Sequence, residues 1–207
     1  MAKSPAARKS PRKGKSKISA RKASPKKSGG KRSPKKSAAR QSPFELLFPD
    51  FDAEVSSTRR MLERVPNGNN DWRPHAKSRT LGELTGHVAQ LPGFGLKMAT
   101  EDEFVGNPQR PDPKIETTAE RLKIFDQLTG QLRAILQGMT WEQVSKPWTL
   151  RIGDRVAFQA PRAAVLRTVF ITHNAHHRAQ IGVYLRMLDV AVPWTYGGSA
   201  DEQVPTT

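Results

Sequence analysis

Cysteine is absent from this chain of 207 residues. Its absence excludes disulfides, thiolate metal sites and cysteine nucleophiles, and it fits a reducing compartment. A run of about 18 apolar residues is also missing, so the sequence predicts no membrane span. The N-terminal segment lacks the apolar core of a secretory signal, because Met1 and Ile18 are its only large apolar residues. We therefore expect a cytoplasmic protein with no membrane partner.

Acidic residues are missing from residues 1–41, which hold sixteen of the chain's 35 Lys and Arg. The other nineteen basic residues are balanced by nineteen Asp and Glu, so residues 42–207 have no net formal charge. The formal charge of +16 therefore belongs to an N-terminal tail. This distribution removes the argument that the globular part is itself a basic nucleic-acid binder.

Residues 1–43 form a low-complexity segment in which Ser-Pro recurs beside Lys or Arg, as in "SPKKSGGK" and "SPKKSAAR". Such a segment cannot bury enough apolar surface to offset the entropy lost on ordering, so we expect it to be disordered. Its composition resembles that of linker-histone tails. Its charge favours nonspecific binding to DNA or RNA phosphates and an association with the nucleoid. The alternative is a solubilising tail with no selected partner. The residues expected to contact nucleic acid are Lys13, Lys15, Lys26, Lys27, Lys31, Arg32, Lys35 and Lys36.

Residues 44–207 have a globular composition, and four amphipathic stretches predict four helices. Two of these stretches open with the capping-box spacing, in which a Thr and a Glu three residues later each satisfy a free amide of the first turn. The expected helices are at about 50–65, from Thr80 through Leu91, at 117–138 and at 161–188. The pattern predicts an all-α four-helix bundle.

Three further expectations concern the segments around these helices. Pro92 and Gly93 are expected to distort the second helix without ending the domain. Residues 139–160 look irregular, with two short strands near "PWTLRI" and "RVAFQ". The last stretch, "VPWTYGGSADEQVPTT", is predicted to be non-helical and to lie against the bundle.

Three of the five histidines lie in the segment "ITHNAHHRAQ". His173 and His177 are four residues apart, so they share one face of the expected fourth helix, and apolar neighbours turn that face inward. His87 falls on the inward stripe of the second helix. Three imidazoles placed in this way can bind a divalent transition metal and leave coordination positions open for water or substrate.

Other interpretations of the histidines stay open at this point. Buried histidines are more often hydrogen-bonded core residues than metal ligands. A pair of His173 with His176 is also conceivable, although His177 aligns better with the apolar stripe. His75 lies in a loop rich in Pro, Gly and Asn, which makes it a poor candidate for a ligand.

The stretches "LGELTGHVAQ" and "THNAHHRAQIGVYLRML" resemble the DinB-like (DinB/YfiT) superfamily of bacterial metalloproteins. The resemblance covers about residues 44–200. It implies a four-helix bundle of the up-down-down-up type. It also implies that His87, His173 and His177 bind nickel, zinc or iron. The family motif often has Gly where this chain has Ala179, and a methyl group there could narrow a close helix contact.

The resemblance also implies a function. Some members of the superfamily are thiol S-transferases that use low-molecular-weight thiols, and others are metal-dependent hydrolases; homodimers are common. Arg178 is expected to orient an anionic substrate group or to form a surface ion pair, and His176 to flank the ligands. Glu83 is the carboxylate nearest to His87, but its capping position favours a structural role. The alternative function is a metal-binding stress or interaction protein without turnover, tethered to DNA by the tail.

Overall fold

The structure is a computed structural model that describes residues 41–107 and 114–205. The eight tail residues expected to contact nucleic acid lie outside the described residues, as does nearly all of the segment expected to be disordered. The described part is mostly helical, in agreement with the predicted fold class. Among its helices, none is both long and apolar enough to cross a membrane.

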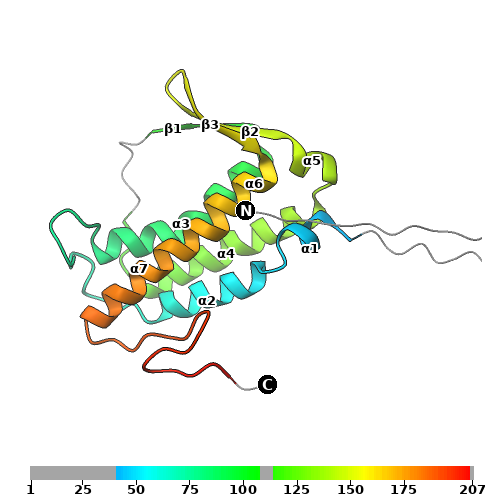
Figure 1. The fold of residues 1–207 in the computed structure, drawn as a ribbon. Helices are drawn as coiled ribbons and strands as arrows, with labels where there is room; N and C mark the ends of the chain where they lie inside the picture. Colours follow the sequence, from blue (N-terminus) through cyan, green and yellow to red (C-terminus); the bar gives the residue numbers. More distant parts are fainter. Residues whose placement is uncertain (1–40, 108–113, 206–207) are drawn as a thin grey trace, which may run out of the picture. The chain divides into compact units, whose positions relative to one another are not determined.

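Four long helical stretches form the bundle (Figure 1). Each begins close to its predicted position, and the capping boxes that predicted the starts of α3 and α4, at Thr80 and Thr117, are formed. Two short helices, α1 (Pro43–Leu47) and α5 (Trp141–Ser145), flank them. The bundle consists of α2 (Phe51–Glu63), α3 (Leu81–Thr100), α4 (Thr118–Gly138) and the final stretch from α6 (Arg162–Leu166) to α7 (His173–Met187).

Side-chain contacts fix the directions of the helices. Helix α2 is antiparallel to α4 and parallel to α7, while α3 is antiparallel to α7 because Tyr184 Oη donates a hydrogen bond to the Arg79 carbonyl (3.2 Å). The order of directions is therefore up, down, down, up, as predicted. The contacts that orient α2 are Asp52–Arg133 and Arg59–Asp126 toward α4, and Asp50–Arg167 and Thr58–Asn174 toward the final stretch.

The final helical stretch differs from the continuous α-helix that was predicted. Between α6 and α7, residues Arg167–Thr172 form a π-helix, in which backbone hydrogen bonds span one more residue than in an α-helix. Helix α3 continues through Pro92 and Gly93, so these residues do not end it; a distortion at Pro92 stays a prediction.

A three-stranded sheet packs beside α6 and the end of α3 (Figure 1). Strands β2 (Pro147–Ile152) and β3 (Arg155–Pro161) are antiparallel neighbours and confirm the two predicted strands. Strand β1 (Glu103–Gly106), which is parallel to β2, was not predicted. Its four residues are too few to show an alternating pattern.

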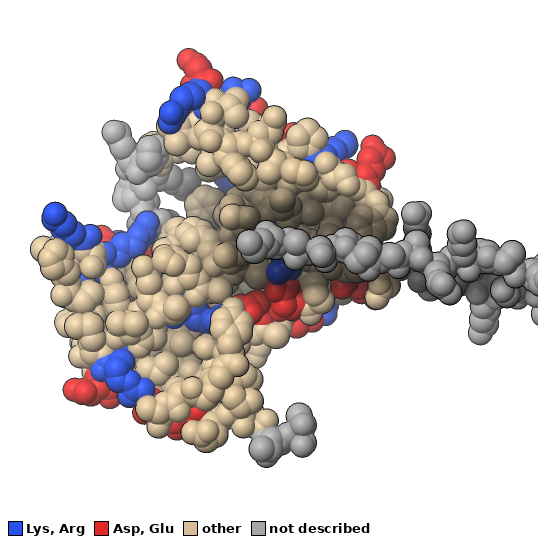
Figure 2. Space-filling view, viewed as in Figure 1, with Lys and Arg blue, Asp and Glu red and all other residues tan. Residues whose placement is uncertain are grey.

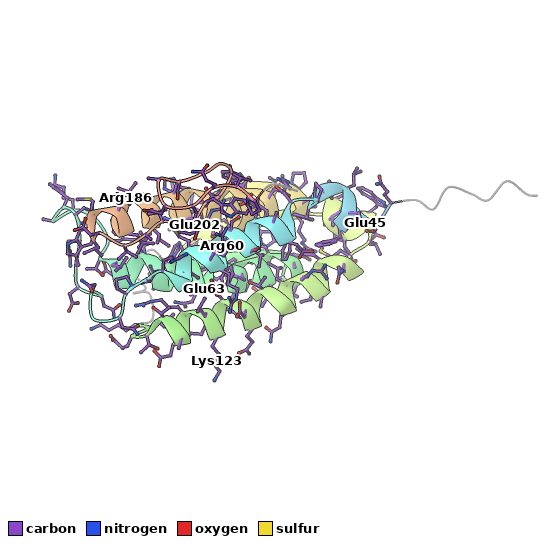
Figure 3. The ribbon with its side chains drawn as sticks, turned by 90° about the horizontal axis from the view of Figure 1, so that it is seen from below. Glu45, Arg60, Glu63, Lys123, Arg186 and Glu202 are labelled. Carbon is purple, nitrogen blue, oxygen red and sulfur yellow. The ribbon has the colours of Figure 1, made fainter. Side chains whose placement is uncertain are left out.

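The C-terminal segment after α7 is non-helical and lies against α2 and α7, as expected. Arg60 and Arg64 of α2 pair with Glu202, and Arg186 of α7 pairs with Asp201. Figure 3 shows Arg60 and Glu202 side by side where this segment crosses α2. Basic and acidic side chains are interspersed over the face shown in Figure 2, in keeping with the neutral charge of residues 42–207.

Candidate metal centre

Three histidines from two helices meet inside the bundle. His87 projects from α3, and His173 and His177 project from the first turns of α7. One nitrogen from each ring lies within 4.8 Å of the others. The ring centroids of His173 and His177 are 4.4 Å apart, and the His87 ring lies 5.4 Å and 4.9 Å from them. The structure thus brings together the three residues that the sequence proposed as ligands.

The π-helix ends immediately before this cluster. His173 is the first residue of α7, so its direction is set by the wider π turn that precedes it. Phe170 and Ile171 within the turn are buried, which fixes the turn in the core. An added residue in a helical turn changes the rotational phase of every residue that follows. The π turn therefore determines how the pair of α7 histidines faces α3.

The hydrogen bonds of the α7 histidines orient their rings. His177 Nδ1 lies 2.7 Å from Oε1 of Gln180, so with the carboxamide oxygen accepting, Nδ1 carries the proton. Nε2 of the neutral ring is then a bare acceptor that faces Nε2 of His173 at 2.7 Å. A hydrogen bond to the Val169 backbone also holds the His173 ring. Two ring nitrogens held this close are stabilised by a cation bound to both, so the donor set fits a divalent metal.

The protonation of His173 also suits metal binding. Burial is the main reason why the pKa of His173 is lowered to about 4, and the neighbouring histidines add to the effect. The ring is therefore neutral at pH 7 and offers a lone pair, as a metal ligand must. Three imidazole donors are typical of sites for zinc, nickel or iron.

A family model for the DinB family matches residues 40–205. The chain belongs to the DinB family. No curated protein is significantly similar to it.

Three solved structures share the fold of this DinB-family chain. A DinB-like protein from Bacillus cereus ATCC 10987 has a TM-score of 0.56 at 19% identity, over 73% of this chain and 97% of the other. The DinB-like protein YjoA from Bacillus subtilis has a TM-score of 0.55 at 19% identity, over 72% and 96%. YfiT from Bacillus subtilis, described as a probable metal-dependent hydrolase with an unusual four-helix bundle topology, has a TM-score of 0.53 at 16% identity, over 78% and 96%.

The remaining site candidates lie outside the cluster. His176 is exposed, with its ring 5.0 Å from that of His177, so it flanks the ligands as expected. His75 is exposed in the loop before α3 and accepts a hydrogen bond from the Lys77 backbone. Glu83 accepts the Thr80 amide at 2.7 Å, which places it in the cap of α3.

Arg178 corrects one expectation for this DinB-family site. A surface ion pair was one of two expectations for Arg178, but only 2% of its side chain is exposed and its ion pair with Glu54 of α2 is buried (2.9 Å). The other expectation, that it orients an anionic substrate group, stays a prediction. Its Nη1 also donates to the Glu54 carbonyl and to Thr58 Oγ1. A residue after His177 on an α-helix points about 100° away, here toward α2. Arg178 therefore joins α2 to α7.

Ala179 corrects a second expectation. It is exposed, so its methyl group narrows no close helix contact. Instead it lines a cavity of about 430 Å³ between α7 and the C-terminal segment. None of the three clustered histidines lines this cavity, which separates it from the candidate metal centre.

Two residues near the centre were missed from the sequence. Gln180 was visible in the helix motif, but its spacing of three from His177 was not recognised as a hydrogen-bonding position. Phe94, whose ring centroid lies 6.5 Å from that of His87, follows His87 by seven residues on the same face of α3. That spacing could have identified Phe94 as a neighbour of His87.

Proposed function

We propose that this DinB-family protein is a metal-dependent hydrolase. The observation that carries the proposal is the convergence of His87, His173 and His177 within 4.8 Å. When bound there, zinc, nickel or iron would supply a Lewis acid that lowers the pKa of a coordinated water or thiol. The protein contributes three imidazole donors, with Gln180 orienting one ring, and burial that keeps His173 unprotonated. The description of YfiT as a probable metal-dependent hydrolase supports hydrolysis as the reaction.

The same centre supports transfer of a low-molecular-weight thiol as a variant of this chemistry, because the metal would lower the pKa of a thiol as it does that of water. Two assays separate the reactions. A panel of esters and amides tests hydrolysis, and a small thiol offered together with an electrophile tests thiol transfer. We expect turnover of one class by protein loaded with nickel, zinc or iron, and none after His173→Ala.

Metal analysis of the same samples tests the ligands directly. Wild-type protein should bind about one equivalent of metal, and His173→Ala should lose most of it. The exposed neighbour gives a matched control, because His176→Ala should retain the metal. Full metal occupancy in His173→Ala would refute the ligand assignment.

A non-catalytic metal-binding protein is the second candidate. It is favoured by the absence, among the described residues, of a carboxylate grouped with the three histidines as a general base. Glu83, the nearest candidate in sequence, is held in a helix cap. Full metal occupancy without turnover of any ester, amide or thiol would support this alternative.

We further propose that the N-terminal tail attaches the protein to nucleic acid without sequence specificity. The support is the contrast between sixteen basic and no acidic residues in 1–41 and the neutral remainder. Such attachment would place a cytoplasmic protein at the nucleoid.

A further inference from the structure

A group of incompletely buried apolar side chains leads away from the three histidines. Phe94 is half-buried on α3, next to His87. Its ring packs edge-on against that of Phe104 in β1, with centroids 6.1 Å apart and an interplanar angle of 87°. The aromatic contact thus connects the metal centre with the sheet.

The register of the sheet extends this group. Phe104 is paired with Leu150 of β2, which is paired with Phe158 of β3, so the three side chains lie on one face. Two residues before Leu150 on that face, Trp148 is 1% exposed, whereas Phe158 is 43% exposed. The apolar face therefore continues beyond the helices that cover it. We call Phe94, Phe104, Leu150 and Phe158 the sheet wall.

A cation lies on the sheet wall. The Lys97 ammonium is 4.8 Å from the centroid of the Phe104 ring, a cation–π contact. Lys97 is exposed, and within the described part of the chain no carboxylate forms an ion pair with it. An ammonium that rests on a ring keeps its donors for an anion on the solvent side.

We propose that the sheet wall binds the apolar body of an amphipathic anionic substrate, with Lys97 holding the anionic end and the reacting group at the three histidines. The assignment of the reacting end rests on the proposed metal-dependent activity. The apolar wall favours an alkyl or aryl body, and the isolated ammonium favours a carboxylate or another small anion over a neutral group.

Binding of octanoate and octanamide to the full-length protein tests this assignment without turnover. These probes share an apolar chain and differ in charge. By calorimetry, octanoate should bind three- to tenfold more tightly than octanamide, in both the metal-loaded and the metal-free protein. Equal affinities for octanoate and octanamide would overturn the role of Lys97. Binding of octanoate to the metal-loaded protein but not to the metal-free protein would overturn the proposal.

Two surface variants separate the contributions. Lys97→Gln should remove the preference for octanoate and leave the affinity for octanamide unchanged. Phe158→Ser should weaken both ligands at least threefold. Lys123→Gln is the control, because Lys123 is exposed on α4 and points away from the bundle in Figure 3. If neither Lys97→Gln nor Phe158→Ser changes octanoate binding, the proposal is wrong.

Sedimentation of the same samples tests whether a second copy of the chain covers the sheet wall instead of a substrate. A dimer that Phe158→Ser dissociates, together with no octanoate binding, would assign the sheet wall to a second copy and overturn the proposal. Ester turnover is measured separately. Its absence in metal-loaded protein would count against the proposed hydrolase, whereas the octanoate titrations decide the sheet wall.

Discussion

At the scale of single residues, two features prepare the candidate metal centre: the hydrogen bond between His177 and Gln180, and the burial of the ligand His173. Gln180 holds the ring of His177 through Nδ1 at 2.7 Å. His173 is kept neutral by burial, which lowers its pKa to about 4. Both effects prepare lone pairs before a metal arrives, which reduces the reorganisation needed on binding.

The first prediction concerns Gln180. Gln180→Leu removes the acceptor for His177 Nδ1, so the ring loses its fixed tautomer and orientation. We expect metal affinity to fall about 10- to 100-fold, the usual effect of removing such a partner. Competition with a chelator measures the change. Gln131→Leu, at an exposed position on α4, is the control and should bind metal like the wild type.

The second prediction is a pH dependence of the metal-free protein. The pKa of His173 is about 4 in the folded state and about 6.5 in the unfolded chain. Between these values the unfolded state binds more protons, so the free energy of unfolding should decrease as the pH falls from 6.5 to 4. Urea unfolding at pH 7, 6, 5 and 4 measures it.

Variants identify the group responsible for that pH dependence. His173→Asn should flatten the decrease, because it removes the group with the lowered pKa. His176→Asn changes an exposed ring and should leave most of the decrease in place. Identical pH profiles for wild type and His173→Asn would contradict the assignment.

At the scale of elements, the sequence predicted the bundle helices better than the features between them. Capping boxes at Thr80 and Thr117 are local signals, so the starts of α3 and α4 could be located. The π-helix could not, because its apolar residues fit an α-helical pattern equally well. The partner of Arg178 could not either, because Glu54 lies on another helix, far away in the sequence.

The candidate site, too, could be predicted from the sequence only in part. The spacing of His173 and His177 on one helix was readable, and the inward stripe of α3 supplied His87. The positions of Phe94, Phe104 and Phe158 beside the site depend on how β1 pairs with β2 and packs on α3. Such long-range pairing leaves no local pattern in four residues.

The third prediction concerns the π-helix. Inserting one alanine after Thr168, an exposed residue of Arg167–Thr172, adds a residue that the π turn does not accommodate and should rotate His173 by about 100° relative to α6. We expect metal occupancy to fall to the level of His173→Ala, with helix content by circular dichroism unchanged. Thr168→Ala keeps the chain length and should bind metal normally. Full occupancy after the insertion would show that the π turn does not orient the ligands.

At the scale of the whole molecule, the net positive charge and the folded domain lie in different parts of the chain. Residues 42–207 carry equal numbers of basic and acidic residues, which are interspersed on the face shown in Figure 2, whereas the charged residues of 1–41 are all basic. Attachment to nucleic acid and chemistry at the histidines should therefore be independent properties.

The fourth prediction tests this separation. In mobility-shift assays the full chain should bind DNA, and the affinity should drop by orders of magnitude between about 50 and 200 mM salt. A chain that begins at Gln41 should not shift DNA but should bind the same amount of metal. Equal DNA binding by both chains would refute the role of the tail.

The up-down-down-up order has a last consequence, for the folding of the chain. Because α3 and α4 are parallel, the chain must run the length of the bundle between them, and residues 88–172 form a long loop that joins His87 to the first α7 histidine. A metal bound by all three ligands closes that long loop and binds the native state alone, much as a late disulfide would. At a thousandfold excess over its dissociation constant it would add about 4 kcal/mol to the free energy of unfolding. In a cell, metal supply would then set the lifetime of the protein as well as its activity.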